Sequence, residues 1–490
     1  MNSYKKRRRP LVKKTVSLTL FIGDIVAMCL AIMVALISAP LVKDIFVHDI
    51  EIFSRERIHD LFFLWICPFV LFFLYSRGHY TQRVPWWTQV QHLFYICFVA
   101  LIIDGFVRFA MMMTFSRLLI GLSWMYTFLF TLAVRQFVYQ IYNRNALWTI
   151  PTIVIGDTDT IIDTLCAFRA DGYTGYDIQA VYIQGEKQKK LTHNILHPFY
   201  KNIHIKKNIK NFDTLIEKYT DHVFIIALES FRGEERDKII NVLSETQTLY
   251  SVIPPVSRLS LFDMEPHYFF GYDLMLLHTK TTIVSPWVQF IKRSMDIVIS
   301  SACLILFAPL MGIIALCLKY EGQDKIFYDG MRIGQNGHEF KCWKFQTMQP
   351  HSEHLVRELF KKNPEAYAYW RKHRKIKSDP RVKTRTGRFL RKTSLDELPQ
   401  LWNVLIGDMS LVGPRPILPE EKKPYRESIN LYYKVRPGIS GLWQVSGRND
   451  TSFNRRVYWD SWYVRNWTLW GDIVILIKTV RVVLCGLGAY

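Results

Sequence analysis

Long apolar runs dominate the first third of the chain, and polar loops separate them. Each run is close to the ~20 residues that an α-helix needs to cross the hydrocarbon core of a bilayer, although the second run is shorter. The pattern therefore predicts a domain of four transmembrane helices over residues 1–145, at Val16–Val42, Leu61–Tyr75, Val90–Met113 and Leu118–Tyr142.

The charges beside these runs predict their orientation. The N-terminus carries five consecutive bases at residues 5–9, whereas the loop Lys43–Asp60 is rich in acids. Lys and Arg favour the cytoplasmic side of a membrane, so the N-terminus is expected in the cytoplasm. An even number of spans then returns everything after residue 145 to the cytoplasm.

Two acids, Asp24 and Asp104, lie inside predicted spans. Ionisable groups within a bilayer are costly and often functional. We favour the simpler interpretation that each makes a polar contact between helices near an interface, because no basic residue lies deep in a span as a partner.

The texture changes after Thr149, where short apolar runs alternate with helical patterns. This alternation predicts a Rossmann-like α/β module over residues 146–280, with strands at Ile178–Ile183, Val223–Ala227 and Tyr250–Ile253. A dinucleotide site needs several glycines in the first turn, but here Gly156 is followed by acids at Asp157 and Asp159. We therefore expect a module without a cofactor.

A fifth apolar stretch, Ile297–Leu318, is long enough to span but holds Pro309 near its centre. Proline removes a backbone donor and bends or breaks a helix. Lys292 and Arg293 flank one end and Lys319 the other, which places both ends on the cytoplasmic side. We expect a re-entrant helix near residues 292–320 that enters one leaflet and returns; a straight fifth span is the alternative.

Composition narrows the class of protein. Half of the 490 residues are hydrophobic, and 63 Lys and Arg against 42 acids give a net charge of +21. This excludes a disordered chain, and with several spans it favours an anionic membrane surface as the partner of the basic charge. No nucleic-acid-binding pattern is evident. The eight scattered cysteines predict neither a disulfide framework nor a zinc site.

Residues 341–397 hold 16 Lys and Arg against six acids, and the adjacent carboxylates Asp396 and Glu397 follow directly after such a basic run. Paired carboxylates can ligate Mg²⁺, which bridges substrate phosphates, and arginines bind phosphoryl oxygens in a bidentate manner. A carboxylate in this setting can also act as a nucleophile. The cluster therefore favours phosphoryl transfer at a pyrophosphate.

Three motifs in this region resemble the bacterial polyprenyl-phosphate sugar-1-phosphate transferases: K-F-Q-T-M (344–348), S-L-D-E-L-P-Q-L-W-N-V-L-I-G-D-M-S-L-V-G-P-R-P (394–416) and R-P-G-I-S-G-L-W-Q-V-S-G-R (436–448). The layout of spans, α/β module and a monotopic catalytic domain at 281–490 is similar to theirs as well. The resemblance covers essentially the whole chain, and its galactose-specific members match best.

The resemblance implies that Asp396 attacks the β-phosphorus of a UDP-sugar and expels UMP. Undecaprenyl phosphate then takes the sugar phosphate, which starts an O-antigen, capsule or exopolysaccharide. Glu397 would assist metal binding or proton handling, and Lys344, Arg391 and Arg415 would contact phosphates or the membrane face. Gln346 stands where the family commonly has a base. A bacterial inner-membrane location is implied, and a homodimer is compatible with the family.

Several alternatives stay open at this point. UDP-glucose is the rival donor, and a membrane-bound sugar-nucleotide oxidoreductase or a non-catalytic glycan-assembly scaffold are the other two interpretations. The final apolar run, Ile473–Leu484, is too short to span and predicts an amphipathic helix. Six tryptophans suit interfacial anchoring, with about half expected in the core: Trp402, Trp443, Trp459, Trp462, Trp467 and Trp470.

Overall fold

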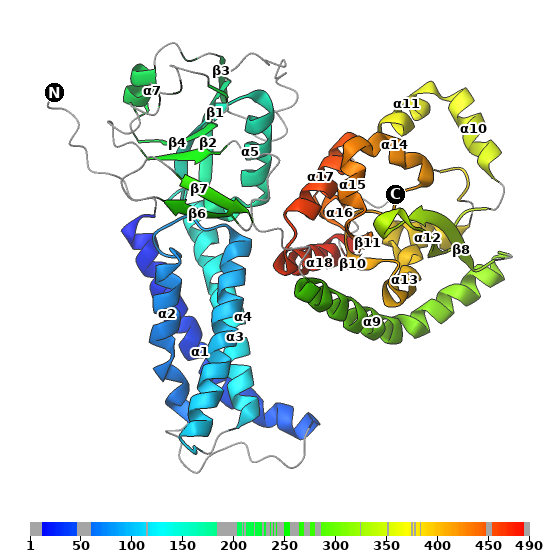
Figure 1. The fold of residues 1–490 in the computed structure, drawn as a ribbon. Helices are drawn as coiled ribbons and strands as arrows, with labels where there is room; N and C mark the ends of the chain where they lie inside the picture. Colours follow the sequence, from blue (N-terminus) through cyan, green and yellow to red (C-terminus); the bar gives the residue numbers. More distant parts are fainter. Residues whose placement is uncertain are drawn as a thin grey trace. The chain divides into compact units, whose positions relative to one another are not determined.

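The computed structural model describes residues 12–46, 60–113, 116–183, much of 203–254, the strands at 264–268 and 275–279, and 286–484 with short gaps at 324, 350–351, 374–375, 377–378, 383 and 447–452. The chain divides into two compact units, Met1–Pro255 and Val256–Tyr490. Each unit is described by itself below, and Figure 1 shows their elements.

The first unit begins with a bundle of apolar helices: α1 (Lys14–Phe46), α2 (Cys67–Ser76), α3 (Trp86–Ala110) and α4 (Arg117–Arg144), with the 3₁₀ helix η1 (Asp60–Trp65) before α2. By length and composition, α1, α3 and α4 are able to cross a membrane, as the apolar pattern predicts. Their cores meet in one cluster around Leu20, Val70, Leu93 and Trp124.

The second expected span folds differently from a single helix. Leu61–Tyr75 forms η1 followed by α2, and Pro68 lies in the first turn of α2, where its missing N–H costs nothing. The rises per residue of a 3₁₀ helix and an α-helix give the two together a length of about 27 Å. This length is close to the ~30 Å thickness of the hydrocarbon core.

Two ion pairs inside the bundle correct an expectation. Asp24 on α1 accepts hydrogen bonds from Arg135 on α4, with Nη2–Oδ2 at 2.6 Å, and from the Tyr80 hydroxyl. Asp104 accepts from Arg108, one turn along α3, with Nε–Oδ1 at 2.9 Å. The view that no base lies deep in a span as a partner is therefore wrong. Packing of α1 on α4 brings Arg135 to an acid 111 positions away.

The α/β part of this unit is a five-stranded parallel sheet of order β3-β2-β1-β4-β5. The three strands read from the sequence are present at the expected positions. The elements are β1 (Ile150–Gly156), α5 (Thr158–Ala170), the 3₁₀ helix η2 (Gly172–Thr174), β2 (Tyr176–Ile183), β3 (His204–Lys207), α7 (Phe212–Lys218), β4 (Val223–Ala227) and β5 (Tyr250–Ile253).

The first turn of this sheet is built for close packing. A Cβ on Gly156 would lie 2.9 Å from the Cβ of Ala227, so a larger residue would push β1 and β4 apart. The carboxylate of Asp157 caps α5 by accepting from the backbone N–H groups of Asp159 and Thr160. These are the amides that would otherwise face a bound phosphate.

Arg83, in the loop before α3, joins the helical bundle to the sheet. Its guanidinium lies 4.6 Å from the Trp148 ring centre and donates to the carbonyl oxygens of Trp148 and Thr174. Gly175 follows with φ at +66°, and a Cβ there would lie 2.5 Å from both Arg83 and the Trp148 ring. The joint therefore needs glycine at position 175.

Gly175→Ala is expected to lower the free energy of unfolding of the full chain by about 2 kcal/mol, because a left-handed Ala is strained and its methyl group meets the Trp148 ring. Thermal unfolding in detergent measures the change. Gly172→Ala is the matched control, since a Cβ there meets nothing within 4 Å. Equal unfolding temperatures for the two variants would contradict this description of the joint.

The described strands of the second unit form three two-stranded sheets. Its strands are β6 (Met264–Tyr268), β7 (Met275–Thr279), β8 (Phe327–Ile333), β9 (Glu339–Phe345), β10 (Ser410–Val412) and β11 (Gly438–Ser440). Its α-helices are α9 (Pro286–Tyr320), α10 (Glu353–Lys362), α11 (Pro364–His373), α12 (Arg385–Thr393), α13 (Gln400–Ile406), α14 (Lys422–Tyr425), α15 (Ile429–Tyr432), α16 (Leu442–Val445), α17 (Phe453–Arg465) and α18 (Leu469–Leu484).

Helix α9 runs for 35 residues and passes through Pro309 without interruption. The expected break at Pro309 is absent, and Figure 1 shows α9 as one continuous, curved helix. A proline costs a helix one hydrogen bond, and the turns on both sides continue. Both arms pack on the same unit: Cys303 and Leu304 join the cluster around Val404, and Ile314 and Leu318 join the cluster around Leu390.

The tryptophans are divided between core and surface, as expected. Trp443 and Trp467 are buried, whereas Trp402 on α13 is 53% exposed. The final run is helical, as predicted, and α18 has two faces: Ile475 lies in the core, and Ile477 and Val480 are exposed.

Candidate active site

The carboxylates Asp396 and Glu397 lie in a short 3₁₀ turn, η6 (Leu395–Glu397), between α12 and α13. Helix α12 ends because Ser394 adopts a left-handed conformation, with φ at +59°, and its N–H bonds the Leu390 carbonyl. On the two sides of the pair, Leu395 and Leu398 pack into the cluster that contains Leu318 of α9. The turn that holds the two acids is therefore anchored on the second arm of α9.

Lys344 on β9 forms an ion pair with Glu397, with Nζ–Oε1 at 2.6 Å. The strand is held in place by Asn403 on α13, whose side chain accepts from the N–H of Trp343 and donates to the carbonyl of Lys341. Asn403 is fully buried, so both bonds are shielded from water. The base from the K-F-Q-T-M motif and the acids 52 and 53 positions later thus lie together in one site.

Asp396 has a carboxyl group that is hard to ionise. Burial and the neighbouring Glu397 carboxylate raise the pKa of Asp396 to about 6, and Lys344 and Arg391 counteract part of this rise. The pair therefore holds one carboxylate, Glu397, that is neutralised by a lysine and one, Asp396, that titrates close to neutral pH. Such a divided pair is typical of acids that take part in chemistry.

Arg391 lies at the end of α12, and its positive charge lowers the pKa of Asp396 by electrostatic attraction. Its Nη1 lies 4.0 Å from Asp379, which is itself held by two hydrogen bonds from Arg381. Asp379 therefore balances part of the charge of Arg391. The structure brings Arg391 into the site, and no hydrogen bond from it to Asp396 or Glu397 occurs among the described residues.

Arg415, from the G-P-R-P motif after β10, is half-buried, and its guanidinium lies 5.5 Å from the Trp443 ring centre. Burial and the nearby Arg456 lower the pKa of Arg415, while Glu397 and Glu421 raise it. A guanidinium with these neighbours is poorly compensated and suits an incoming phosphate.

Gln346, the position where the sequence departs from the family pattern, is buried, and its amide donates to the Met348 carbonyl. Its side chain thus serves its own loop, which agrees with leaving this residue out of the phosphate contacts.

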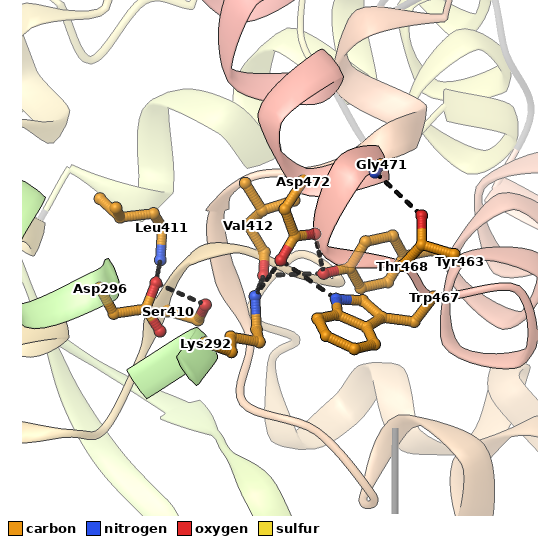
Figure 2. A network of polar contacts seen from close by, with 10 residues as sticks. All are labelled: Lys292, Asp296, Ser410, Leu411, Val412, Tyr463, Trp467, Thr468, Gly471 and Asp472. Carbon is orange, nitrogen blue, oxygen red and sulfur yellow. Dashed lines mark hydrogen bonds and ion pairs between the residues drawn. The ribbon is translucent and has the colours of Figure 1, made fainter. Parts of the chain in front are cut away.

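A buried polar network joins α9 to the segment that carries Arg415, and Figure 2 shows it from close by. Lys292 on α9 donates to Asp472 on α18, with Nζ–Oδ2 at 2.5 Å, and to the Val412 carbonyl. Tyr463 and Trp467 also donate to Asp472. Burial raises the pKa of Asp472, and the Lys292 ammonium opposes this rise.

One turn further along α9, Asp296 accepts from the Ser410 hydroxyl and the Leu411 N–H of β10. Arg293 donates to the last carbonyl oxygens of α13, at Val404 and Leu405. The sequence presented Lys292 and Arg293 as charges flanking a membrane helix. Both instead bond within the unit, because α9 lies directly on β10 and α13.

Sequence reasoning missed a second group of polar residues near Arg415. Arg456 and Asp460 on α17 are buried together with Tyr425, whose hydroxyl donates to Asp460 at 2.7 Å. Burial raises the pKa of Asp460 to about 6. The spacing of Arg456 and Asp460, one helical turn apart, was a signal available in the sequence. Only the fold, however, places them near Arg415, which lies 41 and 45 positions earlier in the chain.

Asp396 and Glu397 are adjacent in the chain, and the pair is too small by itself to form a complete metal site. No group of three or more His, Cys, Asp or Glu occurs within the described part of the chain. Mg²⁺ is commonly held by one or two carboxylates together with substrate phosphates, so the donor set fits a cation that arrives with a phosphorylated substrate.

Comparison with known proteins agrees with this geometry. Residues 287–486, from α9 to α18, match the family model described as bacterial sugar transferase. An uncharacterized sugar transferase of Haemophilus influenzae is 39% identical over 90% of this chain and 91% of its own. The undecaprenyl-phosphate galactose phosphotransferase of Salmonella typhimurium is 36% identical over 84% of both chains. The UDP-glucose:undecaprenyl-phosphate glucose-1-phosphate transferase of Escherichia coli is 34% identical over 53% of this chain and 54% of its own.

The match over residues 287–486 places the second unit among the bacterial sugar transferases. The chain belongs to the bacterial sugar transferase family, and the likeness to the Haemophilus and Salmonella proteins extends through the helical bundle and the parallel sheet.

Lys292→Met is expected to lower the free energy of unfolding of the full chain by about 3 kcal/mol, because the buried Asp472 carboxylate loses its cation. Thermal unfolding in detergent measures the loss. The double variant Lys292→Met, Asp472→Asn removes both charges and should unfold at a higher temperature than Lys292→Met. A double variant whose loss equals the sum of the two single losses would show that the residues are not coupled.

Proposed function

We propose that this protein transfers a sugar 1-phosphate from a UDP-sugar to undecaprenyl phosphate with release of UMP, and so starts the synthesis of a lipid-linked surface polysaccharide. The observation that supports this most is the divided carboxylate pair: Asp396 with a raised pKa beside Glu397, which is neutralised by Lys344. Its position in a chain of the sugar transferase family supplies the substrate class.

In the proposed mechanism, a carboxylate oxygen of Asp396 attacks the β-phosphorus of the UDP-sugar. The bond between this phosphorus and the bridging oxygen breaks, and the oxygen leaves with its electron pair as part of UMP. The sugar phosphate is then held on Asp396 as an acyl phosphate. A phosphate oxygen of undecaprenyl phosphate attacks the same phosphorus, and the bond to Asp396 breaks to regenerate the carboxylate and release undecaprenyl-diphospho-sugar.

The surrounding charges suit this chemistry. Lys344 holds Glu397 and stays close enough to lower the pKa of Asp396, which keeps the nucleophile ionised at neutral pH. Arg391 and Arg415 would stabilise the phosphoryl oxygens as charge shifts to the leaving group. Mg²⁺, held by Asp396 or Glu397 and the diphosphate, would neutralise phosphate charge and orient the donor.

The membrane position of the site is also part of the proposal. The outer face of α9 exposes apolar side chains on both arms, while its inner face packs on the catalytic unit. We infer that α9 enters one leaflet and returns, with the catalytic unit on the cytoplasmic side of the inner membrane. The exposed apolar residues are Trp287, Phe290, Val298, Ile305, Leu306, Ile313 and Leu316.

Galactose is the proposed sugar. The Salmonella relative named for galactose matches over 84% of this chain, and the E. coli relative named for glucose over 53%. The greater extent of this likeness favours galactose, and UDP-glucose is the donor to test against it.

Purified protein with Mg²⁺ and undecaprenyl phosphate is expected to release UMP, faster from UDP-galactose than from UDP-glucose. When the lipid acceptor is withheld, radiolabelled sugar phosphate should remain on the protein, and chelation of Mg²⁺ should prevent labelling. Asp396→Asn should lose both label and turnover, by at least about a thousandfold, since the amide is no nucleophile.

Asp329→Asn is the matched control for this experiment, because Asp329 is a half-exposed acid on β8 whose partner is Lys341. It should keep the wild-type rate. Turnover without labelled protein in the absence of acceptor would contradict the covalent route, and activity of Asp396→Asn would exclude Asp396 as the nucleophile.

The rate should depend on pH through Asp396. Its pKa of about 6 lies above the ordinary value, and the ionised form reacts, so activity is full above this pH and falls as pH drops through 6. Lys344→Met removes a cation that lowers this pKa, so the acid limb of the profile for kcat/KM should move to higher pH. Lys341→Met, a 61%-exposed lysine on the same strand, is the control and should leave the limb in place.

A further inference from the structure

Arg456 is a buried cation whose donors are incompletely used. It lies on α17 with 8% of its surface exposed, and its Nε and Nη2 atoms are buried without a hydrogen-bond partner. The nearest carboxylates are at 3.8 Å, Glu421 from Nη1 and Asp460 from Nε, which is beyond hydrogen-bond distance. A buried guanidinium with two unused donors is costly, and such groups in native structures call for an explanation.

The same cation shares an aromatic ring with the phosphate-binding candidate Arg415. The guanidinium carbons of Arg415 and Arg456 each lie 5.5 Å from the centre of the Trp443 ring. Two cations around one ring repel each other, and Arg415 has no hydrogen bond or ion pair to another residue in the described part of the chain. Among these residues, Arg415 therefore lacks an anionic partner of its own, whereas Arg456 has the carboxylates of Glu421 and Asp460 at 3.8 Å.

We propose that Arg415, Trp443 and Arg456 form the subsite for the phosphate of the departing nucleotide, in which Arg415 contacts the phosphate and Arg456 is a positioning residue. Arg456 supports the Trp443 ring, and its charge holds Arg415 toward the carboxylate pair. A nucleoside diphosphate or monophosphate supplies the negative charge that Arg415 lacks, while Glu421 and Asp460 lie beside Arg456. This assignment rests on the proposed function, because it assumes that a UDP-sugar is the donor whose nucleotide phosphate binds at Arg415 and Arg456.

The position of Arg456 favours the nucleotide, rather than the lipid acceptor, as the ligand of this subsite. Arg456 lies on α17 and the ring that it shares, Trp443, lies on α16, whereas Leu395 and Leu398 link the paired acids to α9. The acceptor phosphate arrives with its lipid tail in the bilayer, on the α9 side under the proposed membrane position. Loss of Arg456 should therefore weaken binding of the nucleotide and leave binding of the lipid unchanged.

The test compares Arg456→Met, Arg456→Lys and the control Arg455→Met in the full chain with UDP-galactose. Arg455 is the adjacent base on α17, but its guanidinium lies over Tyr458 and Trp459. For Arg456→Met we expect the KM for the UDP-sugar and the inhibition constant of UMP to rise about tenfold, with kcat and the KM for undecaprenyl phosphate within about threefold of wild type. Arg456→Lys should recover part of the loss, and Arg455→Met should resemble wild type.

A fall in kcat with unchanged KM and UMP inhibition, or the same effect from Arg455→Met, would overturn the assignment. If Arg456→Met does not fold, Arg456→Lys is the deciding variant. An inhibition constant of UMP for Arg456→Lys equal to that of wild type would contradict the positioning role of Arg456. Direct titration of wild type and Arg456→Lys with UMP separates this inference from the proposed function. Tight UMP binding by a wild type that transfers no sugar phosphate would refute the transferase activity, and weaker binding by the variant would still support the subsite.

Discussion

The ion pair between Lys344 and Glu397 allows two adjacent, half-buried carboxylates to be ionised together. Two neighbouring carboxylates in a partly desolvated turn oppose each other's ionisation, and a nearby cation relieves this opposition. Because Glu397 takes the ammonium, Asp396 keeps a raised pKa yet remains ionisable near neutral pH. Strand β9, the amide of Asn403 and the turn at Ser394 all serve to bring this lysine to this acid.

Helix α9 connects that site to its environment. Its inner face carries Lys292, Arg293 and Asp296 into the catalytic unit, where each finds a partner on β10, α13 or α18. Its outer face is apolar on both arms. A soluble donor and a lipid acceptor can meet only where the two phases meet, so a helix with one polar, anchored face and one apolar face is the element that the proposed reaction requires.

The N-terminal unit shows a similar use of buried polar groups for joining parts. Arg135 ties α1 to α4 through Asp24, and Arg83 ties the bundle to the parallel sheet through Trp148. Each charge is bound by several groups, so its burial cost is offset and the arrangement is specific. The helices and the sheet are therefore built as one unit, although their sequences have different textures.

Local patterns were sufficient for much of this protein. The apolar runs, the parallel strands and the terminal amphipathic helix depend on periodicity, and the Asp396–Glu397 pair stands out by its basic neighbours, so all were readable from the sequence. Tertiary structure decided the rest. Asp24 pairs with Arg135 on another helix, and Lys292 donates to Asp472 inside its unit. Arg456 and Arg415 lie beside the same Trp443 ring. These are contacts between residues far apart in the chain, and the partner of a buried charge depends on which elements pack together, which no local pattern encodes.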